Sequence, residues 1–218
     1  MGKKPVTNMT KRLLLIGGGG HCRSVLDCLL SLESYDEIGI IDHDNKSIRG
    51  IDVIGTDDML PRLFEEGWID AFITVGSIGN TAPRRRIFEM VSQIGFHVPT
   101  IIDKTAVLAG NLQIGEGCFV GKNAVVNCGA SLGRCAIINT GAIVEHDCAV
   151  GDFSHISTGA ILCGHAAIGH DTHIGAGSVV RQLISVGNNV MIGAGSVVVK
   201  NIPDGVTAYG NPCRVVKK

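Results

Sequence analysis

The sequence predicts two folds in succession: a small α/β domain of Rossmann type over residues 11–100, and an all-β parallel β-helix of hexapeptide repeats over residues 101–203. Three observations lead to this prediction. Short apolar runs alternate with helix-like segments in the first half. In the second half an aliphatic residue recurs at every sixth position, a period that no helix has. The chain also has 30 glycines but only 4% aromatic residues, which suits a fold with many tight corners and a narrow interior.

The composition limits the class of protein. With 218 residues and a hydrophobic fraction of 45%, the chain is large enough to bury a core. The net charge of −1 predicts no nucleic-acid partner and no attraction to an anionic membrane. The apolar run Leu13–Ile16 is too short for a signal peptide, and no stretch reaches the ~20 residues of a spanning helix, so we expect a cytoplasmic protein. The eight cysteines form no C-x-x-C pair, and we expect them to be small buried hydrophobic residues.

The elements of the α/β domain follow from the apolar pattern. Residues 1–10 predict a flexible leader. The expected strands are Leu13–Ile16, Ile38–Ile41 and Asp70–Val75, and the expected helices are His21–Leu32 and Pro83–Ile94. Because the strands alternate with helices, a small parallel sheet is predicted. The run Arg84–Arg86 is interpreted as the solvated start of the second helix.

The second half contains sixteen consecutive hexapeptides. The recurring aliphatic residues are Leu108, Ile114, Val120, Val126, Leu132, Ile138, Val144, Val150, Ile156, Leu162, Ile168, Ile174, Val180, Val186, Ile192 and Val198. This spacing predicts a triangular prism in which three hexapeptides make one coil and each aliphatic side chain points inward. Since hydrogen-bonded strands stack at ~4.8 Å, about five coils form a rod of roughly 25 Å. Residues 204–218 are expected to form a C-terminal tail.

A glycine-rich loop separates the first strand from the first helix. Gly17–Gly20 can present bare backbone N–H groups to a diphosphate at the start of a helix. A dinucleotide fingerprint would have glycine where Cys22 stands, so NAD is disfavoured. We interpret Gly18, Gly19 and Gly20, with His21 and Asp42, as a pocket for a uridine-diphosphate sugar. The alternative is a tight strand-to-helix turn without a ligand.

Three segments together resemble a known family. They are the loop Leu15-Ile-Gly-Gly-Gly-Gly-His21, the stretch from Asn139 to His155, and the closing element Tyr209-Gly-Asn-Pro-Cys-Arg214. With the hexapeptide ladder, they resemble the left-handed β-helix acyltransferases, in which Cys213 would commonly be alanine. Within that superfamily the chain resembles the bacterial UDP-4-amino-sugar N-acetyltransferases and the related sialic-acid O-acetyltransferases.

The resemblance implies an activity and an assembly. It implies a homotrimer that binds acetyl-CoA in the groove between adjacent β-helices and a nucleotide sugar on the N-terminal domain, with no metal. On the matching positions His146 would be the general base, and Asp147 or Glu145 would orient it. The residues expected near the thioester and the pantetheine arm are Asn139, His155, Gly164 and Ala194.

The residues around His146 suit this chemistry. An attacking amine must be unprotonated or lose its proton, and a base with a pKa near neutrality removes that proton best. Glu145 and Asp147 flank the histidine, and either carboxylate could hold the imidazole tautomer. Strict strand alternation would place both carboxylates on the opposite face, so we expect a corner to bend the chain here. The N–H of Gly164 is a candidate donor to the oxyanion, and we expect direct transfer without an acyl-enzyme.

Other functions remain open at this point. His165 and His170, with His146 or His155, could bind zinc as in the γ-class carbonic anhydrases, which share the prism. The β-helix could instead only assemble a non-catalytic scaffold that binds sugar nucleotides. An O-acetyltransferase acting on a free sugar such as sialic acid would keep the same mechanism with a different acceptor.

Overall fold

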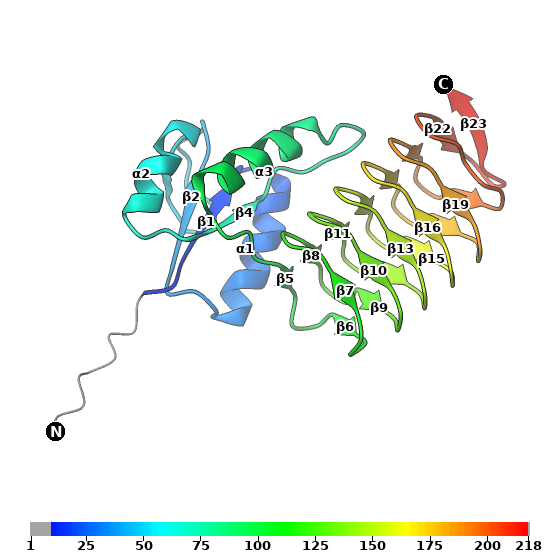
Figure 1. The fold of residues 1–218 in the computed structure, drawn as a ribbon, viewed down its shortest axis with the longest axis horizontal. Coiled ribbons are helices and arrows are strands. Elements are labelled where there is room, and N and C mark those ends of the chain that lie inside the picture. Colours follow the sequence, from blue (N-terminus) through cyan, green and yellow to red (C-terminus); the bar gives the residue numbers. More distant parts are fainter. Residues whose placement is uncertain (1–9, 218) are drawn as a thin grey trace.

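The computed structural model describes residues 10–217 and contains two units, an α/β domain and a rod that extends away from it (Figure 1). The flexible leader expected at residues 1–10 therefore lies, except for Thr10, outside the described residues. The rod is a stack of short parallel strands, and the predicted fold class is confirmed.

The N-terminal sheet is parallel and has the strand order β3-β2-β1-β4. Its strands are β1 (Arg12–Ile16), β2 (Glu37–Ile41), β3 (Val53–Gly55) and β4 (Asp70–Ile73). The helices are α1 (Gly20–Leu32), α2 (Leu60–Glu65) and α3 (Ala82–Ile94), and a 3-10 turn, η1, spans Asp57–Met59. The three predicted strands and two predicted helices are present. β3, η1 and α2 were not predicted, because they are too short to show a period.

Helices cover both faces of this sheet. Leu13 and Leu15 pack with α1, whereas Leu14 and Ile16 pack with α2 and α3. Side chains alternate between the two faces of a strand. Because helices cover both faces of this sheet, all four residues are buried, and β1 is one continuous apolar run.

The rod consists of three sheets, one for each face of the prism. The five-stranded sheet contains β7 (Gln113–Ile114), β10 (Ser131–Leu132), β13 (Ala149–Val150), β16 (Ala167–Ile168) and β19 (Ser185–Val186). The six-stranded sheet contains β6 (Val107–Leu108), β9 (Val125–Val126), β12 (Ile143–Val144), β15 (Ile161–Leu162), β18 (Val179–Val180) and β21 (Val197–Val198). The eight-stranded sheet contains β5 (Ile101–Ile102), β8 (Phe119–Val120), β11 (Ile137–Ile138), β14 (His155–Ile156), β17 (His173–Ile174), β20 (Met191–Ile192), β22 (Thr207–Tyr209) and β23 (Arg214–Lys217).

The predicted register of the ladder is confirmed. Each of the sixteen aliphatic residues is the second residue of a strand, and those from Val120 to Val198 are buried in one continuous core. Neighbouring strands in a sheet are 18 residues apart, as in the pairing of Ile137 with His155 and of His155 with His173. First residues of the strands face outward, and second residues fill the interior.

The C-terminal end departs from this period. Met191 pairs with Thr207 and Ile192 with Ala208, a step of 16 residues instead of 18. β23 then pairs antiparallel with β22, and Cys213 is buried against the core. The eight-stranded sheet therefore continues past residue 203, where we expected a tail to begin.

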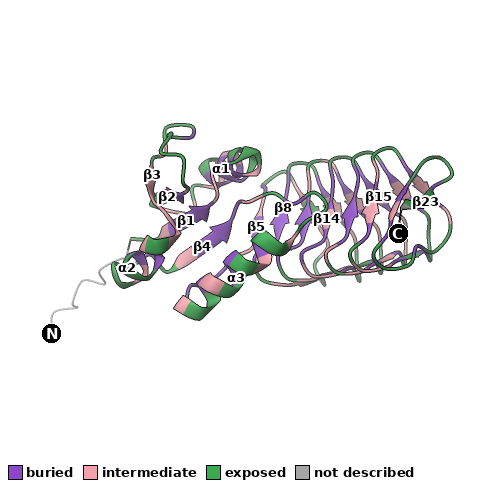
Figure 2. Ribbon diagram, turned by 90° about the horizontal axis from the view of Figure 1, so that it is seen from above, coloured by how far each residue is buried: buried purple, intermediate pink, exposed green. Residues whose placement is uncertain are grey.

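The two units share buried surface along the eight-stranded sheet (Figure 2). Ile101, Phe119 and Ile137 point outward from this sheet and pack in the same cluster as α1. Arg84 of α3 is buried, and its guanidinium donates to the carbonyl oxygens of Val75 (2.8 Å) and Cys135 (2.9 Å). The prediction of a solvated arginine is thus wrong for Arg84, because its buried guanidinium links the segment after β4 to the rod.

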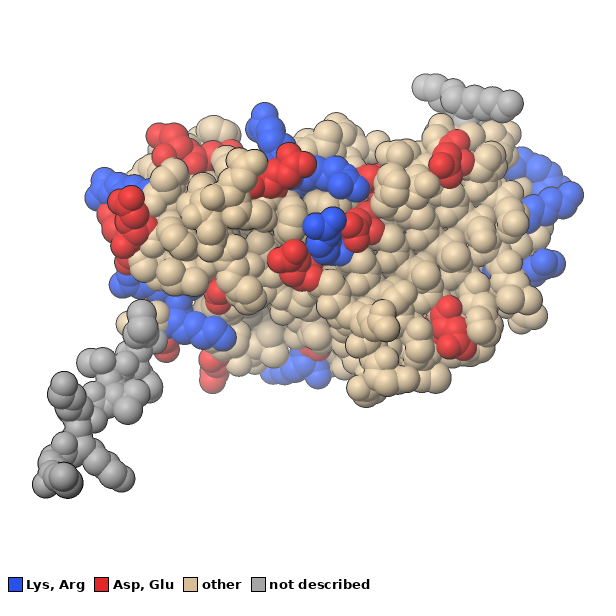
Figure 3. Space-filling view, in the orientation of Figure 1, with Lys and Arg blue, Asp and Glu red and all other residues tan. Residues whose placement is uncertain are grey.

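The surface carries charges of both signs, and most of the cysteines are buried. Basic and acidic side chains are interspersed over the N-terminal domain, and few charges cover the middle of the rod on the face in Figure 3. In residues 10–217, none of the helices has the length and apolar character needed to cross a membrane. Six cysteines are buried as expected, but Cys128 is exposed and Cys163 is half-buried, so the expectation is wrong for these two.

Candidate active site

His146 and Asp147 form a hydrogen-bonded dyad at the corner between β12 and β13. Nδ1 of His146 lies 2.9 Å from Oδ2 of Asp147. Asp147 has φ +59°, and its N–H donates to the carbonyl of Cys128 in the preceding coil (3.0 Å). This left-handed corner turns the carboxylate toward the imidazole, which a regular strand would not do. The hydrogen bond to His146 is the main cause that lowers the pKa of Asp147, so the carboxylate stays ionised.

Glu145 has a different partner. Its Oε2 accepts a hydrogen bond from the backbone N–H of His146 at 3.3 Å. Of the two carboxylates that the sequence offered, the structure therefore places Asp147 against the imidazole ring and Glu145 against the backbone.

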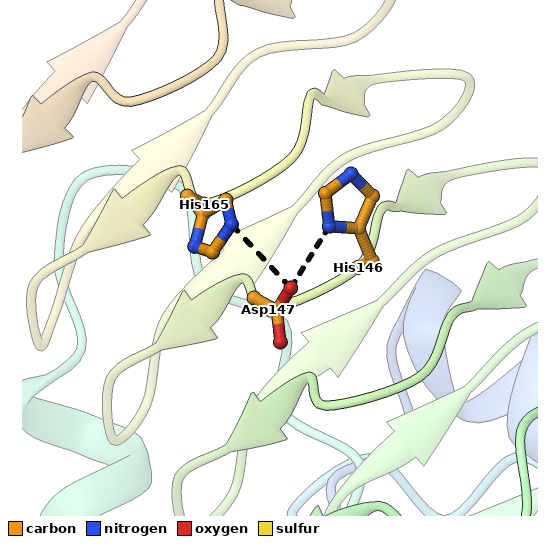
Figure 4. A group of neighbouring side chains, drawn as sticks. All are labelled: His146, Asp147 and His165. Carbon is orange, nitrogen blue, oxygen red and sulfur yellow. Dashed lines mark hydrogen bonds and ion pairs between the residues drawn. The ribbon is translucent and has the colours of Figure 1, made fainter.

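Gly164 lies next to His146, one coil further along the rod. A Cβ atom at Gly164 would be 2.5 Å from Nε2 of His146, so only glycine leaves room for this ring position. His165 follows, with its ring centroid 5.3 Å from that of His146 and its Nε2 3.5 Å from Oδ2 of Asp147 (Figure 4). Two imidazoles thus share one carboxylate oxygen.

Three other predicted residues line a groove of about 430 Å³ on the eight-stranded sheet: Asn139, His155 and Ala194. Nδ1 of His155 lies 3.0 Å from the carbonyl oxygen of Ser77, and its Nε2 lies 3.0 Å from Nδ2 of Asn139. A carbonyl can only accept and an amide nitrogen can only donate, so His155 is held as the neutral Nδ1–H tautomer. Burial lowers the pKa of His155 to about 4, in agreement with this tautomer.

The glycine loop opens onto an adjoining cavity of about 440 Å³ that lies between the two units. Gly20, His21, Ser77 and Asn139 are among its lining residues. A Cβ atom at Gly19 or Gly20 would meet no atom within 4 Å, so the start of α1 faces open space there. Burial is also the main cause that lowers the pKa of His21 to about 3, and its ring forms a T-shaped pair with that of Phe119.

Gly18 and Asp42 have a role inside the loop. The N–H of Gly18 and the N–H of Asp44 both donate to the Asp42 carboxylate. Partial burial would raise the pKa of Asp42, but these backbone hydrogen bonds outweigh it and hold the pKa below its usual value. Asp42 therefore fixes the shape of the loop, a contact that the sequence analysis did not predict.

Nine of the twelve predicted site residues fall into two clusters, and the other three, Gly18, Gly19 and Asp42, belong to the glycine loop and the strand end beside it. Glu145, His146, Asp147 and Gly164 gather at the corner between the six-stranded and five-stranded sheets. Gly20, His21, Asn139, His155 and Ala194 lie around the cleft on the eight-stranded sheet. Of the histidines suggested for zinc, His146 and His165 meet at Asp147, whereas His170 pairs with Asp171 (2.6 Å) and His155 lies in the cleft.

Three further residues lie beside these clusters: His173 and Ser77, which were not predicted, and His165, which was named only as a possible zinc ligand. His173 packs edge-on against His155 (4.9 Å between centroids), Ser77 accepts the bond from His155, and His165 contacts Asp147. The 18-residue coil was the available signal, since it stacks residue 173 on residue 155 and residue 165 on residue 147. Ser77 had no such signal because it comes from the other unit.

Family models match both the α/β domain and the rod. The family model described as the PglD N-terminal domain matches residues 12–91, and the hexapeptide repeat of succinyl-transferase matches residues 111–146 and 166–200. The acetyltransferase domain of PglB from Neisseria gonorrhoeae, in complex with acetyl coenzyme A, is 39% identical with a TM-score of 0.90, covering 95% of this chain and 100% of that chain. No curated protein sequence matches the chain.

Two further solved structures extend the comparison. A histidine mutant of perosamine N-acetyltransferase from Caulobacter crescentus, in complex with CoA and GDP-perosamine, is 31% identical with a TM-score of 0.89, covering 94% of this chain and 97% of that chain. WeeI from Acinetobacter baumannii has the same fold, at 21% identity and a TM-score of 0.77, over 94% of this chain and 99% of that chain.

The chain is an acyltransferase of the left-handed β-helix, hexapeptide-repeat superfamily, because its fold, its repeat and the proteins it matches all belong to that class. More narrowly, the chain belongs to the family of nucleotide-sugar N-acetyltransferases that includes PglB and perosamine N-acetyltransferase. The resemblance expected from the three sequence segments is thereby confirmed.

Proposed function

We propose that this enzyme transfers the acetyl group of acetyl-CoA to the amino group of a UDP-linked 4-amino sugar, with His146 as the general base. One observation carries the proposal: the ring of His146 is fixed by Asp147 at Nδ1 while its Nε2 faces the glycine of the next coil. The relatives crystallised with acetyl coenzyme A and with CoA and GDP-perosamine support the co-substrate and the class of acceptor.

In this mechanism Nε2 of His146 takes a proton from the amine as its nitrogen attacks the thioester carbonyl. Asp147 stabilises the imidazolium that forms, because its ionised carboxylate already holds Nδ1–H. The N–H of Gly164 is the proposed donor to the oxyanion. Collapse of the tetrahedral intermediate breaks the C–S bond and releases CoA as a thiolate, which is reprotonated by His146 or by water.

The nucleotide sugar is assigned to the cleft beside the glycine loop. Gly19 and Gly20 leave space at the N-terminus of the 13-residue helix α1, whose first turn contains no acidic residue. Free backbone N–H groups and the helix dipole favour a diphosphate at such a position. His21, nearby in the same cavity, is held neutral and so offers a polar contact without a charge.

We further propose a cytoplasmic homotrimer. The dyad and the cleft lie on different sides of the prism in one chain, so a neighbouring chain could bring an acceptor in its own cleft to this dyad. Light scattering would give the number of chains. Mixing a His146→Ala chain with a chain damaged only in the cleft tests shared sites, because activity should reappear in the mixed assembly if the clefts and dyads of different chains cooperate.

The activity is tested by thiol release from acetyl-CoA with UDP-linked and GDP-linked 4-amino sugars and free sialic acids. The expected result is turnover with a UDP-linked amino sugar and a fall of about 10²–10⁴-fold in kcat for His146→Ala. His97→Ala is the matched control, since His97 also pairs with an aspartate, Asp70, but far from the dyad in the fold. Turnover of His146→Ala within a few-fold of the parent would rule out His146 as the general base. A preference for sialic acid would mean that the acceptor is a free sugar and not a UDP-linked amino sugar.

A further inference from the structure

The dyad is part of a larger group with metal-ligand chemistry. His146, Asp147 and His165 each offer a ligand atom, and these atoms lie within 4.8 Å of one another. Both imidazoles direct a nitrogen at the same carboxylate oxygen, Nδ1 of His146 at 2.9 Å and Nε2 of His165 at 3.5 Å (Figure 4). Residues 10–217 contain no other group of three that meets this spacing.

We propose that His146, Asp147 and His165 form an inhibitory site for Zn²⁺. Two imidazole nitrogens and one carboxylate oxygen are ligands that zinc prefers, with water in the fourth position. A tetrahedral ion with bonds of 2.0–2.1 Å separates its ligand atoms by about 3.3 Å. The two separations to the carboxylate oxygen, 2.9 Å and 3.5 Å, lie on either side of this value, and the two imidazole nitrogens lie within 4.8 Å of each other. Side-chain rotations that adjust these separations complete the site.

The coil backbone holds the three ligands in place before a metal arrives. The N–H of Asp147 donates to the carbonyl of Cys128, and the N–H of His165 donates to the carbonyl of His146, each at 3.0 Å. All three side chains are about half exposed, so an ion can reach them from solvent. The site therefore combines a fixed backbone with an open path.

Metal binding here would stop the proposed chemistry, and this part of the inference rests on the proposed role of His146. When a metal occupies Nδ1 of a neutral imidazole, the remaining proton moves to Nε2. Nε2 then has no lone pair with which to accept a proton from the amine. Zinc also coordinates the Asp147 carboxylate, which would otherwise stabilise the imidazolium. The ion is thus expected to lower kcat without competing for the nucleotide cleft.

Binding is measured first, by calorimetric titration of the full-length protein with Zn²⁺ in the absence of substrates. One ion per chain is expected, and His165→Asn should weaken binding by at least roughly tenfold. His97→Asn is the matched control because it removes a histidine paired with an aspartate outside the group. Equal affinity in the parent and in His165→Asn would overturn the site.

Inhibition is measured next, as turnover with added Zn²⁺ against turnover in EDTA. Each protein is compared with its own turnover in EDTA. The parent should lose activity in the concentration range of the calorimetric binding, whereas His165→Asn should need at least roughly tenfold more zinc for the same fractional loss. Zinc bound at the site with full turnover retained would overturn the inhibitory role. Absence of acetyl transfer in EDTA would instead refute the proposed function, and it would leave the calorimetric result standing.

Discussion

Nδ1 of His146 lies 2.9 Å from Oδ2 of Asp147, although the two residues are adjacent in sequence. Adjacent side chains in a strand point to opposite faces, so this contact exists only because Asp147 adopts φ +59° at a prism corner. In the hexapeptide fold, the carboxylate that orients the proposed base His146 thus comes from the next residue in sequence, and no distant segment is required.

Replacing Asp147 by asparagine should lower kcat by roughly 10²-fold or more, because an amide cannot stabilise the imidazolium and can hold the wrong tautomer. Acetyl-CoA binding, measured by calorimetry, should persist. Glu145→Gln is the matched control, since Glu145 contacts only the backbone N–H of His146. A larger loss of kcat in Glu145→Gln than in Asp147→Asn would reverse the assignment of the two carboxylates.

Gly19→Val should raise the KM for the nucleotide sugar by roughly tenfold while leaving the KM for acetyl-CoA unchanged. Gly19 has an extended backbone (φ −75°, ψ −166°) that valine can adopt, and its Cβ would point into open space at the start of α1. The fold should lose less than about 1 kcal/mol, the scale of a weakened helix cap.

Gly18→Val provides the contrast, because its Cβ would lie 3.1 Å from both the Asp42 carboxylate and Ile48. This variant should unfold at lower urea concentration than Gly19→Val. If Gly19→Val instead changed only the KM for acetyl-CoA, the cleft would have to be assigned to the co-substrate.

Arg84→Met should reduce the free energy of unfolding by about 1–3 kcal/mol, because the carbonyls of Val75 and Cys135 would lose a buried donor. The loss should be visible as a lower urea midpoint, and limited proteolysis should then cleave between the two units. Arg86→Met, an exposed neighbour on the same helix, should change the midpoint little. Similar midpoints for both variants would show that Arg84 does not hold the units together.

Stability should fall as the pH is lowered from about 6.5 to 4. In the unfolded chain His155 binds a proton near pH 6.5, but burial lowers its pKa to about 4 in the folded protein. The unfolded state therefore binds more protons in this window, and the free energy of unfolding decreases with falling pH by up to about 1.4 kcal/mol per pH unit for this residue. His21 acts in the same direction, with its pKa at about 3.

Urea unfolding at several pH values between 7 and 4 checks this expectation. His155→Gln, which cannot titrate, should show a shallower decline than the parent protein. His97→Gln is the control, because His97 is exposed. An identical decline in the parent and in His155→Gln would mean that His155 binds protons equally in the folded and unfolded states, so that burial does not lower its pKa.

The sequence by itself determined the rod. A six-residue period leaves one solution in which every sixth residue from Val120 to Val198 is buried, and the structure has that register. The five longer elements of the α/β domain were predictable for the same reason, since each has enough residues to show its own period. β3 and α2, with three and six residues, do not.

The tertiary structure alone decided how the chemistry-bearing residues meet. The choice of Asp147 over Glu145 depends on a backbone angle, and the bond from His155 to Ser77 joins segments 78 residues apart. Arg84 belongs to a run that looks solvated, yet it is buried because α3 docks on the rod. Periodicity reports which side of an element faces the core, whereas these contacts depend on corners and on the packing of one unit against another.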